Sequence, residues 1–150
     1  MYKKTIKYTD EEGQVKEEEF FFHLTKAEIT EMEYSYGGGL TAVIESLSRK
    51  QEIGKVIEII KSVVLKAYGE KVFDRTGKER FVKTQLASDI FASTEAYSEL
   101  FMSFVENPDS FNEFLIGVMP IDMQADIRKA MKEQGKLPNN GSVAPPSALK

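Results

Sequence analysis

The side chains able to do acid–base or metal chemistry are few in this chain and do not cluster. His23 is the only histidine, and the alternating residues around it predict a strand that places it between Phe22 and Leu24. A catalytic imidazole needs a nucleophile or an acidic partner held against it, and a zinc site needs several nitrogen or sulfur ligands. Because the sequence has no cysteine and no second histidine, we interpret His23 as a packing residue at the rim of the fold and expect no metal site.

The carboxylates and glycines do not supply other chemistry. Glu17 to Glu19 alternate on a predicted strand, and no second ligand type lies near Glu28 and Glu31, so solvated charge explains these residues better than cation binding. Gly37 to Gly39 lack the GxGxxG spacing, and Gly77-Lys78 lacks the rest of a Walker-type phosphate loop. No GxSxG elbow is present. We therefore expect no enzymatic activity, no catalytic residue and no cofactor.

Composition and charge narrow the remaining function classes. The 150 residues are 41% hydrophobic and 29% charged, which is typical of one soluble domain with its own core. The net charge is −4, and because residues 136–150 hold two lysines and no acid, residues 1–135 carry −4 − 2 = −6. An acidic body with interleaved basic residues disfavours nucleic-acid binding. No signal peptide or transmembrane run is recognisable, so we expect no membrane partner and a site of action in the cytosol.

The first 36 residues predict a β-hairpin followed by a capped helix. Residues 2–8 alternate, with Ile6 and Tyr8 on one face, and residues 10–13 supply a turn before the return arm at 15–24. Thr25 and Glu28 form a capping box that should begin a helix. The glycines at 37–39 should end it.

The rest of the chain predicts helices. Apolar residues recur at helical spacing over 40–47 and 52–68, and Gly69 is the expected left-handed terminator. Residues 72–82 suggest a small hairpin or an exposed loop. A helix from Thr84 should carry one apolar face made of Leu86, Ile90 and Phe91. Further helices are predicted over 97–105, from Pro108 to about 119, and over 121–134, where Gly135 ends the last one.

These elements predict an α+β fold that is mainly α-helical, with the N-terminal antiparallel hairpin packed on about six helices. We expect one domain over residues 1–135. Residues 136–150 contain three of the five prolines and no aromatic residue, which predicts a flexible, disordered tail.

Five segments together resemble the small tail assembly chaperones of long-tailed, siphovirus-type bacteriophages of Gram-positive hosts. None of these segments is a catalytic motif, and the resemblance depends on their combination over most of residues 1–120. The segments are residues 1–10, 19–28, 66–71, 80–83 and 94–102.

The resemblance implies a function and a set of partners. Members of the family coat the long helical tape measure protein in the infected host cytoplasm, keep it soluble while major tail tube subunits polymerise, and are absent from the mature virion. They are commonly made in two lengths by ribosomal frameshifting, for which the Gly135-Lys136 codons are a candidate site. Self-association would suit a coat, but no residue pattern demonstrates it. The alternative class is a small helical regulator that binds DNA or another protein, although no predicted helix is basic along one face.

An aromatic and methionine-rich quarter of the chain supplies the predicted partner-binding residues. Methionine adapts to varied apolar surfaces, although most of these side chains would also suit a small helical core. Met102 lies off the predicted apolar stripe of its helix, so it is the strongest candidate for an exposed contact. The predicted set is Phe101, Met102, Phe104, Phe111, Phe114, Met119 and Met123.

Overall fold

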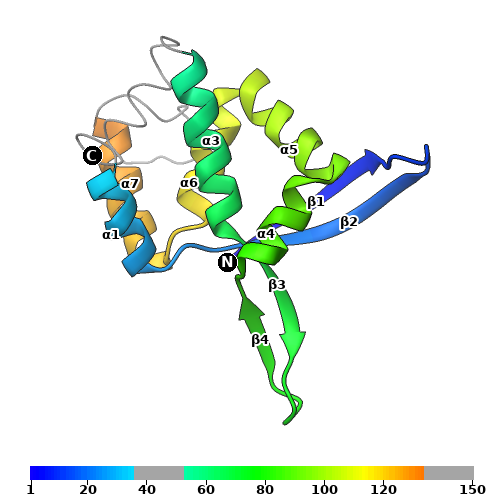
Figure 1. Ribbon diagram of the computed structural model, residues 1–150. Helices are drawn as coiled ribbons and strands as arrows, with labels where there is room; N and C mark the ends of the chain where they lie inside the picture. The colour runs from blue at the N-terminus through cyan, green and yellow to red at the C-terminus, as the bar shows by residue number, and fades with distance from the viewer. Residues whose placement is uncertain (36–52, 134–150) are drawn as a thin grey trace.

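The computed structural model describes residues 1–35 and 53–133, and it confirms a mainly helical α+β fold (Figure 1). The described residues form four strands and six helices. In chain order these are β1 (Tyr2–Thr9), β2 (Val15–Phe22), α1 (Lys26–Ser35), α3 (Ile53–Ala67), β3 (Tyr68–Phe73), β4 (Glu79–Val82), α4 (Gln85–Ala92), α5 (Glu95–Glu106), α6 (Pro108–Gly117) and α7 (Ile121–Glu133).

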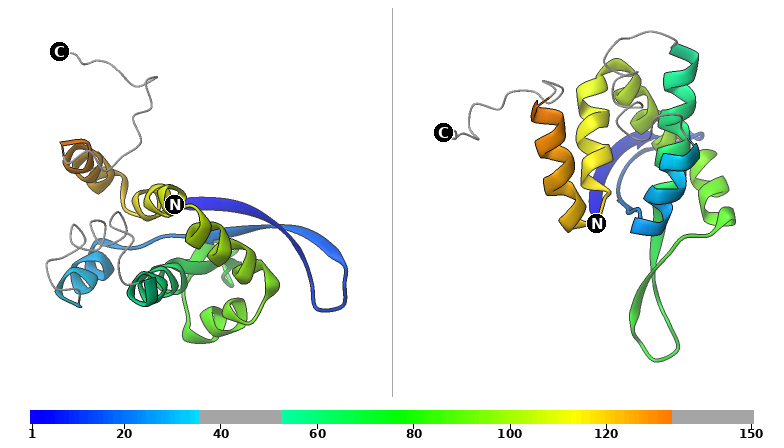
Figure 2. Two further views of the ribbon diagram at one scale, coloured as in Figure 1. Left: turned by 90° about the horizontal axis from the view of Figure 1, so that it is seen from above. Right: turned by 90° about the vertical axis from the view of Figure 1, so that its left-hand side faces the viewer.

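The four strands form one antiparallel sheet in the order β1-β2-β3-β4. The predicted N-terminal hairpin is confirmed, and its register pairs Tyr2 with Phe22 and Lys7 with Glu17. Residues 72–82 form the second hairpin, β3–β4, rather than an unstructured loop. Both hairpins extend beyond the helices, the first past α5 and the second below the helical layer (Figures 1 and 2).

The core lies where one face of β1 and β2 meets the helices. Phe22 and Phe114 are fully buried and their ring centroids are 5.2 Å apart, which joins β2 to α6. Phe91 of α4 stacks on Tyr68 of β3 at 4.2 Å. Because aromatic pairs of this kind add to the free energy gained from burial, this cluster fixes how the helices lie on the sheet.

The predicted helix starts are confirmed where side chains cap them. The Thr25 hydroxyl accepts a hydrogen bond from the Glu28 N–H at 3.2 Å, and Glu28 Oε1 accepts one from the Thr25 N–H at 2.9 Å, which completes the capping box at α1. The Thr84 and Thr94 hydroxyls cap α4 and α5 by accepting hydrogen bonds from the Ala87 and Tyr97 N–H groups. Pro108 is the first residue of α6, although the Asn107 side chain makes no capping hydrogen bond.

The predicted role of Gly69 as a left-handed helix terminator is wrong. Helix α3 passes directly into β3, where Gly69 pairs with Phe21 of β2, and only Gly13 and Gly77 have positive φ among the described glycines. The reason for glycine here is close packing. A Cβ atom on Gly69 would lie 2.4 Å from Phe81 Cζ and 2.8 Å from Lys83 Cγ, so any larger residue would displace both side chains.

Replacing Gly69 by valine should therefore destabilise the fold. We expect a loss of about 1–3 kcal/mol, the usual penalty for overpacking, measured by urea unfolding. The double variant Gly69→Val with Phe81→Ala removes the closest contact and should recover part of that loss. If the double variant is as unstable as the sum of the two single variants, the clash with Phe81 is not the cause.

Several predicted features lie outside the described residues. These are the apolar pattern over 40–47, the glycines at 37–39, the Gly135 terminus and the tail at 136–150. The domain boundary at residue 135 therefore stays a prediction.

Candidate partner-binding surface

The residues predicted to bind a partner fall into two groups in the structure. Phe104, Phe111, Phe114 and Met119 are buried core residues, so a partner could reach them only if the packing opened. Phe104 lies on α5 and packs against Phe111 and Phe114 of α6, and Met119 follows the end of α6. The other three residues lie nearer the surface.

Met102 is the most accessible member of the predicted set. Its side chain is 47% exposed on α5, as its position off the buried stripe of that helix predicts. Phe101 and Met123 are partly buried and pack against the core. Partner binding by these three residues stays a prediction, and Met102 alone presents a large exposed surface.

Helix α4 carries a more exposed apolar pair than the predicted set does. Leu86 is 69% exposed and Ile90 is 57% exposed. The two residues are four positions apart in a helix, so they lie on one face, one turn from each other. Two exposed branched aliphatic side chains in this arrangement form a ridge that an apolar helix face can contact. We call Leu86 and Ile90 the α4 ridge.

The orientation of α4 is fixed by contacts that its other faces make with the rest of the protein. Ala87 and Phe91 are buried, and the Ser88 hydroxyl donates a hydrogen bond to the Leu65 carbonyl of α3 at 2.9 Å. At about 100° per residue, Ser88 lies opposite the α4 ridge, and the Ala87/Phe91 pair lies about 100° around the helix from the ridge. The ridge is therefore held outward by packing and a hydrogen bond to other elements.

The predicted apolar face of Leu86, Ile90 and Phe91 is accordingly wrong in part, because only Phe91 is buried. The sequence itself indicates that α4 has two apolar faces. Leu86/Ile90 and Ala87/Phe91 are two neighbouring pairs at i,i+4 spacing, and together they span about 140° of an eight-residue helix, so either pair could be the buried one. Which pair is buried depends on the partners Tyr68 and Leu65, so local sequence cannot decide it.

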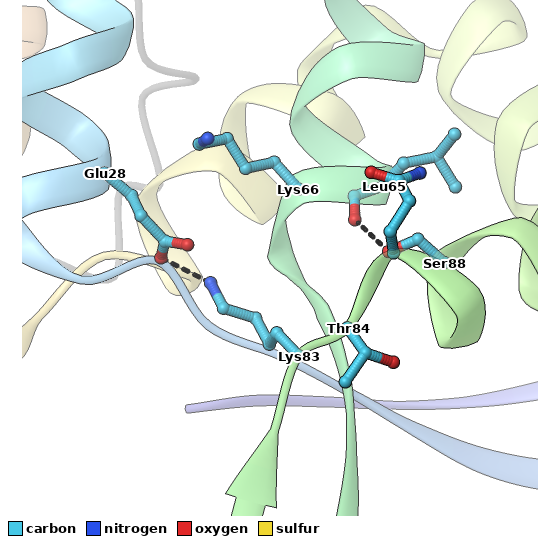
Figure 3. Close-up of a pocket in the computed structure, with 7 residues that line it drawn as sticks. Glu28, Leu65, Lys66, Lys83, Thr84 and Ser88 are labelled. Atoms are coloured by element: carbon cyan, nitrogen blue, oxygen red, sulfur yellow. Dashed lines mark hydrogen bonds and ion pairs between the residues drawn. The ribbon is translucent and has the colours of Figure 1, made fainter.

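A polar pocket of about 310 Å³ lies between α1, α3 and α4, where β4 ends (Figure 3). It is lined by Glu28, Leu65, Lys66, Lys83, Thr84, Gln85 and Ser88. Thr84, which caps α4, and Ser88, which donates a hydrogen bond to α3, both line this pocket. Two residues of the pocket therefore also fix the orientation of the α4 ridge.

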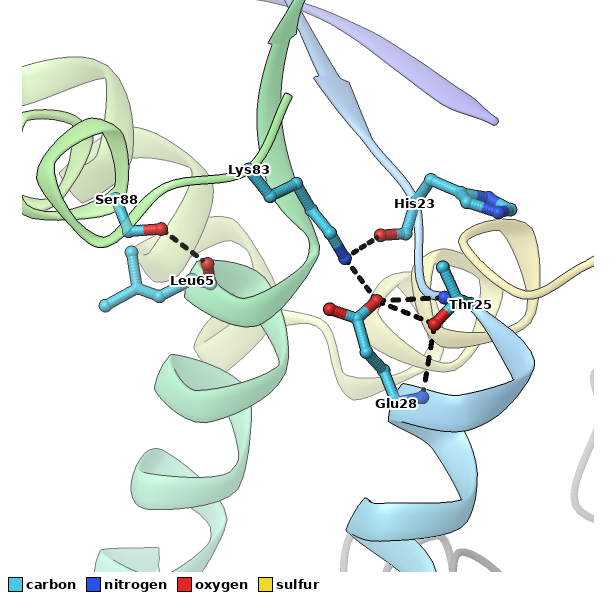
Figure 4. A network of polar contacts seen from close by, with 6 residues as sticks. All are labelled: His23, Thr25, Glu28, Leu65, Lys83 and Ser88. Atoms are coloured by element: carbon cyan, nitrogen blue, oxygen red, sulfur yellow. Dashed lines mark hydrogen bonds and ion pairs between the residues drawn. The ribbon is translucent and has the colours of Figure 1, made fainter. Parts of the chain in front are cut away.

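Lys83 and Glu28 join three elements at this pocket (Figure 4). The Lys83 ammonium donates to Glu28 Oε1 and, at 2.8 Å, to the His23 carbonyl oxygen. Partial burial alone would raise the pKa of the Glu28 carboxyl, but the hydrogen bonds from Lys83 and the Thr25 N–H outweigh it and hold this pKa below its ordinary value of 4.5. The end of β4 is thereby tied to the start of α1.

This network predicts a pH-dependent contribution to stability. Because the pKa of Glu28 is lower in the folded state than in the unfolded state, its contribution is complete above the ordinary value of 4.5 and is lost as the pH falls below it. We expect Glu28→Gln to lower the free energy of unfolding by about 1–3 kcal/mol at pH 7. At pH 3 the variant and the parent should differ much less in urea unfolding.

The matched control is Glu31→Gln on the exposed face of the same helix. Its effect should stay below about 0.5 kcal/mol at both pH values. A Glu28→Gln penalty that is the same at pH 7 and pH 3 would show that the carboxylate charge does not contribute through this network.

His23 does not form a catalytic pair among the described residues. Its Nδ1 is buried without a hydrogen-bond partner, and burial together with nearby positive charge lowers the pKa of the imidazole below its ordinary value of 6.5. The side chain is half-buried at the end of β2, as a rim packing residue would be. Its backbone carbonyl, rather than its ring, contributes to the Lys83 network.

Residues 1–35 and 53–133 contain no group of three or more histidine, aspartate or glutamate side chains placed to hold a metal ion. None of their helices has the length and apolar character needed to span a membrane.

Comparison with known proteins identifies a family. The family model described as "Phage tail assembly chaperone" matches residues 1–148, nearly the whole chain. No curated protein and no solved structure matches.

Proposed function

Because the chain belongs to the phage tail assembly chaperone family, we propose that it binds the tape measure protein and keeps this client soluble while tail tube subunits polymerise around it. The resemblance seen in the sequence is confirmed at the level of the family. The observation that supports binding of a helical client is the α4 ridge, which presents two large aliphatic side chains to solvent.

The ridge suits a long amphipathic helix as its partner. Such a client exposes an apolar stripe along its length, and helix recognition commonly uses apolar side chains spaced at i and i+4. Met102 supplies an additional exposed and adaptable apolar side chain on α5. Covering these side chains removes apolar area from water on both partners, which is the driving force that we assign to the complex.

Charge gives the complex a means of staying dispersed. The chain carries a formal net charge of −4, and coated clients of like charge repel one another. In this proposal the protein acts by non-enzymatic binding in the host cell cytoplasm. Tail tube protein then displaces it from the client, so it is not retained in the mature virion.

Coexpression of this chain with the tape measure protein of the same phage tests the proposal. We expect the client to be insoluble when expressed alone, and to be soluble and to copurify with this chain when the two are coexpressed. A client that stays insoluble in the presence of folded chain would contradict the proposal. A salt-sensitive shift of duplex DNA by the purified chain would instead support a regulatory function.

A further inference from the structure

The turns of the two hairpins have the same backbone architecture. In the first, the Asp10 N–H donates to the Gln14 carbonyl at 2.8 Å and the Gly13 N–H to the Asp10 carbonyl at 3.0 Å. In the second, the corresponding bonds join Asp74 to Lys78 and Gly77 to Asp74, both at 2.9 Å.

The side chains that define the turns are also equivalent. Each aspartate accepts hydrogen bonds through Oδ1 from the N–H groups two and four residues later, and the two glycines have φ of +85° and +82°. The chain therefore builds one rigid turn twice, with the sequence pattern Asp-x-x-Gly-x, and the x positions are open to vary.

The variable positions give the two turns opposite charge. Residues 7–17 have four acidic and two basic side chains, a net charge of −2, whereas residues 71–81 have four basic and two acidic side chains, a net charge of +2. Asp10 pairs with Lys16 at 3.1 Å, and Asp74 pairs with Arg80 at 2.7 Å.

Further charged side chains lie at the tips of the two hairpins, that is, in their turns. Within the described part of the chain, no ion pair involves Glu11 or Glu12 at the first turn, or Arg75 or Lys78 at the second. All four side chains are exposed.

Both tips are also accessible, and they cannot meet within one molecule. The two hairpins project from the body in different directions (Figures 1 and 2). A large apolar side chain lies beside each turn, Val15 at 65% exposed and Phe73 at 72% exposed. Each tip thus combines uncompensated charge of one sign with an exposed apolar residue.

We propose that the acidic β1–β2 turn of one copy of this chain docks on the basic β3–β4 turn of a second copy. Glu11 and Glu12 of one copy face Arg75 and Lys78 of the other, and Val15 packs against Phe73. A second copy is the expected partner because its turn has the same backbone hydrogen bonds and carries the opposite charge. This self-association is independent of the proposed client.

The contact is head-to-tail, because the two surfaces involved are different. After the first contact, one copy still has a free basic tip and the other still has a free acidic tip, so the interaction repeats and forms a ring or an open helical array. Contacts made by exposed charges are individually weak and are screened by salt. We therefore expect association that rises with protein concentration and falls as salt is added.

Charge reversal with complementation tests this inference. Glu11→Lys/Glu12→Lys gives a chain with two basic tips, and Arg75→Glu/Lys78→Glu gives one with two acidic tips. In sedimentation velocity at low salt, the association constant of each variant alone should fall about tenfold or more relative to the parent. An equimolar mixture of the two variants should restore association, because basic and acidic tips meet again.

The variants leave Asp10, Gly13, Asp74 and Gly77 in place, so both turns should form, which circular dichroism and thermal unfolding will check. Glu31→Lys/Glu33→Lys on the exposed face of α1 makes the same charge change as the first variant and should associate like the parent. A parent chain that is monomeric at every concentration overturns the inference. So does a mixture that associates no more than its two components.

Discussion

Replacing Phe114 by alanine is expected to lower the free energy of unfolding by about 3–5 kcal/mol. The Phe114 side chain is fully buried. Its ring lies 5.1 Å from that of Tyr2, 5.2 Å from that of Phe22 and 4.9 Å from that of Phe104. The substitution leaves a cavity where β1, β2, α5 and α6 meet, and these rigid aromatic neighbours cannot collapse into it. Because small domains are stable by only about 5–15 kcal/mol, this loss is a large fraction of the total, and the variant should unfold at a clearly lower urea concentration than the parent.

Urea unfolding of the purified variant measures this effect. The matched control is Phe73→Ala, because the Phe73 side chain is 72% exposed on β3 and its loss should change stability by less than about 0.5 kcal/mol. Equal effects at the two positions would show that Phe114 is not in a packed core. Phe114 would then again be a candidate for binding a partner.

Replacing both residues of the α4 ridge by glutamine is expected to abolish solubilisation of the tape measure protein. Fully burying a leucine or isoleucine contributes about 1.5–3 kcal/mol, and these two side chains already have part of their area covered, so we assign the pair about 2–4 kcal/mol. That corresponds to a loss of affinity of roughly 30- to 700-fold. The measurement is the soluble fraction of the client on coexpression with the Leu86→Gln/Ile90→Gln variant.

The substitution leaves the net charge and the core unchanged, because both residues are uncharged and exposed. Tyr34→Gln/Ile121→Gln is the matched control, since it removes two exposed apolar side chains from α1 and α7. The control should solubilise the client as well as the parent does. Equal losses in the two variants would mean that general surface hydrophobicity, rather than the ridge, holds the client.

Sequence patterns were sufficient for features set by neighbouring residues. Three helix-start signals each act over three or four residues, so they can be recognised without knowing the fold. They are the capping box of Thr25 and Glu28, the threonine before α5 and the proline at the start of α6. The alternation that paired β1 with β2 is equally local. The family resemblance rested on segments drawn from these same elements.

Features set by distant residues were not predicted. Gly69 is required because Phe81 lies over it, and that contact depends on the β3–β4 pairing. The direction of α4 depends on Tyr68 and on the Leu65 carbonyl. For the same reason, most of the predicted partner-binding aromatics proved to be core residues: helical spacing of apolar side chains is the same whether the stripe meets the body of the protein or a client.

Site-specific photocross-linking in cells that coexpress the tape measure protein tests the central claim most directly. A photoreactive amino acid at position 86 should cross-link to the client, whereas the same group at Glu58, which is exposed on α3, should give little or no product. Client that is soluble and copurifies, yet cross-links from position 58 and not from position 86, would contradict the assignment of α4 as the binding surface.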